Sequence, residues 1–189
     1  MADITNSYVS LIELKAWVNV TSQDHDTLLS TCAVVAASQI DNYCGRRFYA
    51  ASASASARSF VTTPDIKYLF TDDFTELTSV TVDGAAVACE ANITPYSRPY
   101  TAIRASDGAY FPYFFGGRTA IVTAKFGWAA QPEIIGTANL MLAARIFERR
   151  LSPFGIQGSP DIGLIRVTGE DRDVTALIGP YRKLAGMCA

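Results

Sequence analysis

The sequence is poor in the residues that most often carry catalysis and metal binding. It has one histidine, His25, and four cysteines, at positions 32, 44, 89 and 188, with no CxxC pair among them. A single histidine and scattered cysteines cannot supply the ligand set of an ordinary zinc site. The sequence also lacks a GxxxxGK[ST] phosphate loop and a GxGxxG fingerprint. We therefore expect no metal, no cofactor and no enzymatic activity.

Charge is equally scarce, at 18% of the 189 residues, whereas hydrophobic residues make up 49%. The net charge of −2 argues against a protein that binds nucleic acid by neutralising phosphates. No run approaches the eighteen or so apolar residues of a membrane helix, and the N-terminus has no signal-peptide pattern. We expect no membrane association, a reducing cytoplasm and four unpaired thiols. The high apolar content indicates that a partner covers part of the surface.

Helical patterns stand at both ends of the chain. Ser10 and Glu13 have the spacing of a capping box, which predicts the start of a first helix. The polar run 21–24 predicts the cap of a second helix, whose apolar residues recur at helical spacing until Gly45. Apolar spacing after Pro132 predicts a third helix.

The middle of the chain, over 58–128, has the pattern of short strands. Alternating residues over 77–82 lead into Asp83-Gly84, a strong hairpin signal. The cluster 71–73 predicts a turn between two strands. The preceding run 50–57 alternates Ala and Ser and predicts a linker or an exposed strand.

These patterns predict an α+β fold, a small bundle of three to four helices with an antiparallel β module inserted between the second and third helices. We expect 1–49 and 132–151 to form the bundle core and 50–131 to form the inserted module. The segment 152–169 is rich in Gly and Pro and predicts a flexible loop, so that 152–189 comprises a loop and a C-terminal helix.

Three further features allow two interpretations each. His25 suits an exposed residue at a helix start better than a general base, and Asp72-Asp73 suits turn chemistry better than a cation site. The aromatic cluster between Tyr96 and Phe115 suits a packed sheet face or a protein interface. Stacking on bases or binding of a sugar by that cluster remains an alternative, namely a ligand-binding α+β domain.

Three passages together resemble a known family. The first comprises 8–15, 24–29 and 36–48. The second comprises Val80-Thr81-Val82-Asp83-Gly84, Phe126-Gly127-Trp128 and the helix from Pro132 to Arg149-Arg150. The third comprises Asp173-Val174, Leu177-Ile178 and Pro180-Tyr181-Arg182. In this order they resemble the head–tail connector (adaptor, head-completion) proteins of long-tailed double-stranded DNA phages.

The resemblance implies a structural protein of the virion neck. Such proteins form a ring of twelve subunits between the portal and the stopper or tail-completion protein, and DNA passes through the channel without sequence-specific binding. The resemblance also implies a location in the virion after assembly in the host cytoplasm. It makes 170–185 the portal-docking segment, with contacts from Val174, Leu177, Ile178, Tyr181 and Arg182. Another neck or tail-completion protein of the same machine is the alternative.

Overall fold

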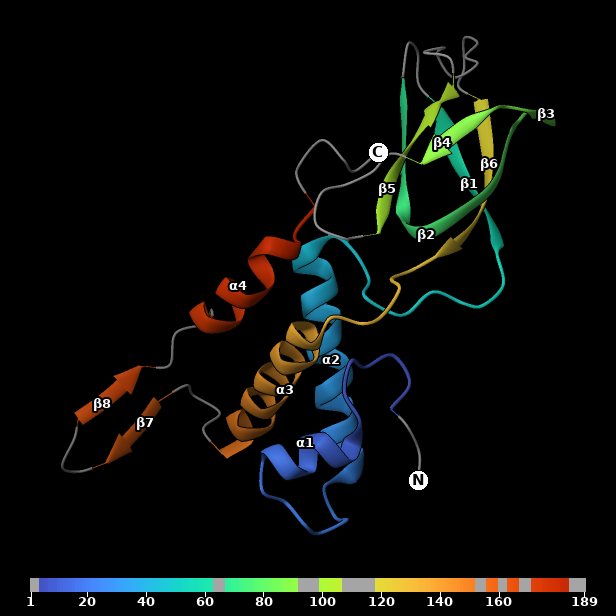
Figure 1. Cartoon of the computed structure of the whole chain (residues 1–189). Coiled ribbons are helices and arrows are strands. Elements are labelled where there is room, and N and C mark those ends of the chain that lie inside the picture. Colours follow the sequence, from blue (N-terminus) through green and yellow to red (C-terminus); the bar gives the residue numbers. More distant parts are fainter. Residues whose placement is uncertain are drawn as a thin grey trace. The chain divides into compact units, whose positions relative to one another are not determined.

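The computed structural model describes residues 4–62, 67–91, 99–106, 118–151, 156–159, 163–166 and 171–183 (Figure 1). It is an α+β structure with four α-helices and a six-stranded antiparallel sheet in these ranges. The chain divides into two compact units. We call residues 1–45 with 132–182 the helical unit, and 46–131 with 183–189 the sheet unit.

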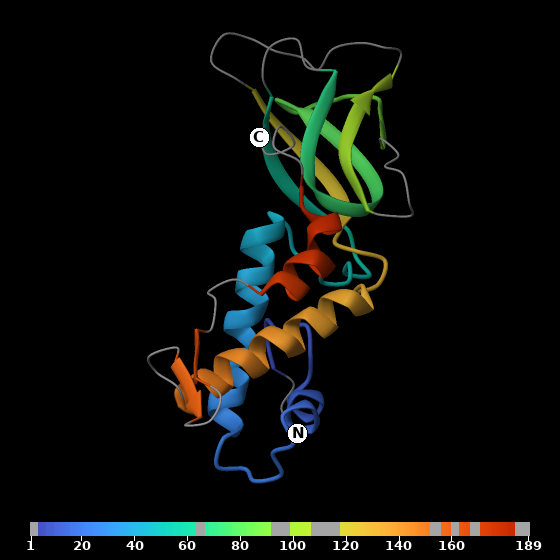
Figure 2. The same cartoon turned by 90° about the vertical axis from the view of Figure 1, so that its left-hand side faces the viewer.

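The helical unit is built around its longest helices. These are α2 (Asp26–Cys44) and α3 (Glu133–Glu148), which pack side by side (Figures 1 and 2). The shorter helices α1 (Leu11–Trp17) and α4 (Arg172–Ile178) both pack against α3. Single 3₁₀ turns follow α3 and α4, η2 (Arg149–Leu151) and η3 (Gly179–Tyr181). The core where α1, α2 and α3 meet contains buried Leu14, Leu29, Ala33, Ala36, Ala143 and Phe147.

The ends of the first helices follow local sequence signals, with one exception. The predicted capping box is confirmed, because the Ser10 hydroxyl accepts from the Glu13 amide while the Glu13 carboxylate accepts from the Ser10 amide at 2.7 Å. Gly45 ends α2 in a left-handed conformation at φ 64°, as predicted. The predicted cap over 21–24 is wrong. Ser22 bonds locally to Asp24 instead, and α2 begins two residues later without a side-chain cap.

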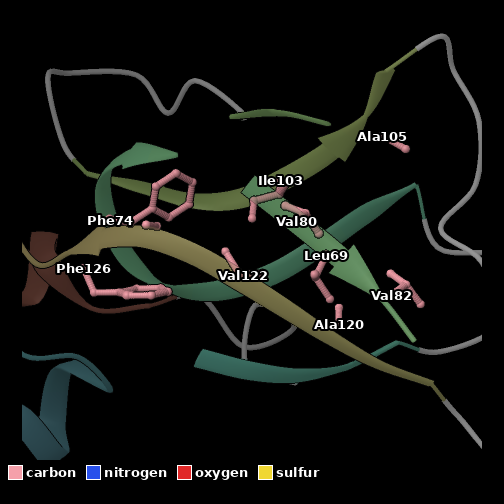
Figure 3. Close-up of a cluster of buried hydrophobic side chains, with 10 residues drawn as sticks. Leu69, Phe74, Val80, Val82, Ile103, Ala105, Ala120, Val122 and Phe126 are labelled. Atoms are coloured by element: carbon pink, nitrogen blue, oxygen red, sulfur yellow. The ribbon is translucent and has the colours of Figure 1, made fainter. Parts of the chain in front are cut away.

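The sheet unit contains six strands in the order β1-β6-β2-β5-β4, with β3 paired to β2. Their bounds are β1 (Ser56–Thr62), β2 (Tyr68–Val82), β3 (Ala85–Ala86), β4 (Cys89–Ala91), β5 (Tyr100–Ala105) and β6 (Arg118–Phe126). Figure 3 shows the core of this unit, to which Phe74 and Phe126 contribute rings and Leu69, Ile103 and Val122 contribute aliphatic side chains. In β6, alternate residues are buried in this core, which is the period-two pattern of a half-buried strand.

Two sequence predictions within the sheet unit have opposite outcomes. The Asp83-Gly84 hairpin is confirmed, since both residues have positive φ, 49° and 84°, and join β2 to β3. The predicted turn over 71–73 is wrong, because these residues lie inside the 15-residue strand β2. The register shifts between Phe70 and Phe74, so the polar residues mark an irregularity in one strand instead of a gap between two.

A third difference concerns the segment that predicts a loop. Within 152–169, the residues of β7 (Ile156–Ser159) and β8 (Gly163–Arg166) pair as an antiparallel two-stranded sheet. Strands of four residues that contain glycine are too short to show a period-two pattern. The Gly and Pro content that predicts a loop is also what a tight hairpin needs.

Candidate functional site: assembly surfaces

The predicted docking residues lie on and just after α4, and they differ in how accessible they are. Val174 and Ile178 are buried, at 2% and 3% exposure, and α4 packs on α3. Leu177 and Tyr181 are half-buried, whereas Arg182 is exposed. Val174 and Ile178 therefore pack within the helical unit, and the contact of all five residues with a partner stays a prediction. The apolar spacing of a docking helix and of a core helix is the same, so the sequence could not separate them.

Polar contacts of Asp171 stabilise the start of α4 and join it to α3. The Asp171 carboxylate caps the helix by accepting from the backbone amides of Asp173 and Val174. The same carboxylate lies 2.9 Å from the guanidinium of Arg145 on α3. After the helix, the Arg182 guanidinium stands 5.6 Å from the centre of the Tyr43 ring on α2. The side of this segment that carries Leu177, Tyr181 and Arg182 remains the accessible part of the predicted docking segment.

The exposed side of α2 carries no charge. We call it the α2 face, and it consists of Thr27, Leu28, Thr31, Val35, Ser38, Gln39, Asn42 and Tyr43. The two carboxylates of the helix are engaged within the unit, Asp26 with Lys15 at 2.6 Å and Asp41 with the Tyr8 hydroxyl at 2.5 Å. A solvent-facing helix surface normally carries charged residues. An uncharged face with exposed Leu and Val is a candidate protein interface.

A second uncharged surface lies on the outer face of the sheet unit. Ile121 of β6 stands at its centre, between its register partners Ser59 of β1 and Thr81 of β2. Its neighbours above and below on the same three strands are also uncharged. We call this set the uncharged sheet face, and it consists of Ala57, Ser59, Val61, Ser79, Thr81, Thr119, Ile121 and Thr123.

Ion pairs mark the two ends of this face. Lys125 of β6 pairs with Glu76 at 2.5 Å, and Arg118 pairs with Asp83 at 3.0 Å. The other half of the same sheet has a different outer surface, where exposed Tyr68, Arg104 and Glu90 are register neighbours. Arg104 and Glu90 form an ion pair there at 3.2 Å. An uncharged centre with a charged rim is the anatomy of a protein–protein interface.

The aromatic cluster of the ligand-binding alternative lies mostly outside the described residues. Tyr100 is described, and its ring lies 5.4 Å from that of Phe74. It lines an open cavity of about 580 Å³ together with residues 75–80 of β2 and residues near β4. Cys89 also lines this cavity, and burial raises the pKa of its thiol to about 11. At neutral pH that thiol is protonated and a poor nucleophile. The remaining members, Tyr96 and the aromatics from Tyr110 to Phe115, have no described placement.

A buried polar cluster around Asp73 is a feature that sequence reasoning missed. The carboxylate lies 3.7 Å from the Arg46 guanidinium and accepts from the Trp128 indole at 3.2 Å, while the Asp73 carbonyl accepts from the Gly127 amide. Burial raises the pKa of Asp73, whereas Arg46, Lys183 and the Trp128 bond oppose that rise. The cluster joins the segments where the chain enters and leaves the sheet unit. Asp73 is therefore a structural residue of that junction rather than a turn residue.

The other features that could carry chemistry have structural surroundings. The His25 ring packs edge-on against Phe147 at 5.7 Å, just before α2. In the part of the chain that the structure describes, no three His, Cys, Asp or Glu side chains gather as a metal site. No helix among those residues is both long and apolar enough to cross a membrane.

Comparison with known proteins finds similarity at the level of structure. No protein-family model and no curated protein matches the chain. A chain in the neck of an empty gene transfer agent (GTA) particle, computed with C6 symmetry, matches with a TM-score of 0.60 and 19% identity. The match covers 98% of this chain and 94% of that one. This chain has the fold of a GTA neck chain.

Two further solved structures contain chains of the same fold. One is the virion of a native GTA particle, with a TM-score of 0.57 and 20% identity. The other is the neck of a native GTA particle computed with C12 symmetry, with a TM-score of 0.57 and 18% identity. Each match covers 98% of this chain and 94% of the other. The likeness therefore includes both the helical unit and the sheet unit.

Proposed function

We propose that this chain is a structural protein of a virion neck and that it works there as a ring of identical copies. The observation that carries the proposal is the shared fold over 98% of the chain with chains of GTA neck structures. Those neck structures were computed with C6 and C12 symmetry, which repeats one chain around an axis. A ring of twelve copies, assembled in the host cytoplasm and retained in the virion, fits this symmetry.

Within the neck, we assign the chain to the adaptor position between the portal and the stopper or tail-completion protein. The order of its sequence motifs supports this position, and its uncharged surfaces support a role in contacts rather than in catalysis. The DNA passes through such a ring, and the net charge of −2 gives the protein no general attraction for phosphates.

Two surfaces divide the contacts of the helical unit in this proposal. The accessible side of the α4 segment, with Leu177, Tyr181 and Arg182, docks on the portal. Val174 and Ile178 keep α4 anchored in its own unit, because they are buried there. The α2 face meets the neighbouring copy, since a closed ring needs one heterologous contact repeated between copies.

A lysate from cells that produce particles, with a stop codon at Trp17 in the gene for this chain, tests the neck assignment. Electron microscopy should show DNA-filled heads without tails, and addition of the purified chain should restore tailed particles. Normal infectious particles in the absence of the chain would contradict the proposal.

A pair of neighbouring substitutions tests the portal contact. Leu177→Asp places a charge on the proposed docking side, while Ala176→Asp places the same charge at an exposed position on the same helix. Binding to purified portal should weaken about tenfold or more for Leu177→Asp alone, because an unpaired charge would be desolvated in the contact. Equal effects of both variants would contradict docking through this side. Binding to the tail tube instead of the portal would favour the other neck position.

A further inference from the structure

We propose that the uncharged sheet face binds a second copy of this chain, so that neighbouring copies in the ring touch through their sheet units. The inference rests on the proposed function, because it takes the ring of identical copies from there. It goes beyond it by assigning a contact to the sheet unit and by naming the surface that makes it.

The pattern along β6 is the first argument. Its inward residues, Ala120, Val122 and Ala124, are buried in the core of the unit. Its outward residues run Thr119, Ile121, Thr123 and then Lys125, so charge is confined to the end of the strand. Contact with this surface removes apolar and hydroxyl groups from water without desolvating a charge. The ion pairs at both ends remain in the solvated rim.

The edge beside this face is the second argument. Among the described strands, β1 pairs with β6 and with no other, so its far side is an edge of the sheet. Val61 on this edge strand is 67% exposed, the highest value among the exposed large hydrophobic side chains of the described residues. An exposed edge strand next to an uncharged surface is a site where another chain can pair or pack. A permanent contact in an assembly would cover such a site.

A second copy fits this surface better than a partner of another chemistry. Nucleic acid or a charged protein would be recognised by complementary charge, and the face has none. The solved neck chains share the fold of the sheet unit and recur around a symmetry axis, so each sheet unit has a neighbour of its own kind. The opposite half of the same sheet carries the Arg104–Glu90 pair and is suited to solvent.

Photo-crosslinking of the full chain tests the proposal with a matched control. A benzophenone amino acid replaces Ile121 in one variant and Tyr68 in the other, since these residues are 43% and 41% exposed and lie on opposite halves of the sheet. Irradiation is applied to concentrated purified protein and to complemented particles. We expect covalent chain–chain products at position 121 on particles and none at position 68. Equal products at both positions, or no chain–chain product at 121 in either sample, would overturn the proposal.

Substitutions give a second readout that does not need the crosslinker. Ile121→Lys should weaken self-association at least about tenfold in sedimentation velocity, or leave particles with fewer copies of the chain. Tyr68→Lys should change neither, and circular dichroism should show both variants folded, because both positions face solvent.

The outcome also separates this inference from the proposed function. A chain that is located in the neck but crosslinks from position 121 to a different virion protein would sink the sheet contact and leave the neck role standing. Chain–chain products in the purified protein, together with absence of the chain from particles, would support the sheet contact and contradict the neck role.

Discussion

The helical unit and the sheet unit pack their hydrophobic cores in different ways. In the helical unit, small residues such as Ala33, Ala36 and Ala143 allow α2 and α3 to approach closely. The residues that pack between the two helices recur at helical spacing along each of them. In the sheet unit, larger aliphatic and aromatic side chains fill the core, and strands far apart in sequence must pair in register. The sheet unit therefore depends, in addition to its side-chain packing, on close approaches between backbone segments that are distant in the sequence.

One such close approach lies where the chain enters and leaves the sheet unit. The Trp128 amide donates to the Tyr49 carbonyl at 3.0 Å, and the Ala51 amide donates to the Trp128 carbonyl at 2.8 Å. Gly127 lies in this pairing at φ 125°, a conformation that side chains disfavour. A Cβ at this position would stand 2.8 Å from the Ala51 Cα and 2.9 Å from the Tyr49 carbonyl oxygen. The two connecting segments can therefore approach only because this residue is glycine.

The largest expected effect is that of Gly127→Ala, at about 3 kcal/mol or more of unfolding free energy lost from the sheet unit. Strained φ and collision with backbone atoms both contribute, since backbone cannot move aside as a flexible side chain can. Hydrogen exchange resolved by peptide should show the loss in strands β1 to β6, with the helices retaining protection.

Gly84→Ala is the matched control for that prediction. Gly84 also has a positive φ, 84°, but a Cβ there meets nothing within 4 Å. Its cost should be about 1 kcal/mol, the conformational part alone. Similar losses for both variants would contradict the close approach of the connecting segments.

The helical unit has a polar counterpart at Asn139, which is fully buried on α3. Its Nδ2 donates to the Ala33 carbonyl on α2 at 3.1 Å, and its Oδ1 accepts from the Ser7 hydroxyl at 3.0 Å. Asn139→Ala should lower the unfolding free energy by about 2 kcal/mol, because it removes both bonds and leaves a small cavity. Denaturant unfolding measures this loss, and the weaker variant Ser7→Ala should lose less. Loss of exchange protection in the sheet strands instead of the helices would contradict independent cores.

The contrast between the units also explains what the sequence could predict. Signals that act over a few residues predicted correctly the capping box at Ser10, the end of α2 at Gly45 and the hairpin at Asp83-Gly84. Signals whose interpretation depends on residues far away in the sequence gave wrong predictions. Asp73 suggests a turn until Arg46 and Trp128 are brought to it from elsewhere in the chain.

The same limit applies to the candidate surfaces. The apolar spacing on α4 was readable, but only packing on α3 decides that Val174 and Ile178 face inward. The uncharged sheet face was not readable at all, because its three strands become neighbours only in the folded sheet. Its residues are Ser, Thr, Ala, Val and Ile, which suit any strand and carry no signal of exposure.

Protonation of Asp73 gives a pH-dependent comparison between the buried polar cluster and the rest of the fold. Burial, the largest influence, raises its pKa above the ordinary 3.8. The folded state then binds the proton more tightly than the unfolded state. The contribution of Asp73 to stability is therefore full below pH 3.8 and falls as pH rises through the raised pKa. The unfolding free energy of the wild-type chain, relative to that of Asp73→Asn, should therefore fall as pH rises through that window. A difference that stays flat, or that moves in favour of the wild type with rising pH, would contradict this assignment.

The smallest expected effect belongs to the most local feature, the cap of α1. Hydrogen bonds from the Ser10 amide and hydroxyl lower the pKa of Glu13, so the contribution of Glu13 is present above its ordinary pKa and is lost as pH falls through the lowered value. Ser10→Ala should lower the unfolding free energy by about 1 kcal/mol at neutral pH and remove part of that acid sensitivity. Ser38→Ala, at an exposed position in the middle of α2, is the control and should be neutral or slightly stabilising. Because the cap acts only on its own helix, hydrogen exchange should rise in α1 alone. A loss of exchange protection that spreads to the sheet strands would show that the cores of the two units are not stabilised independently.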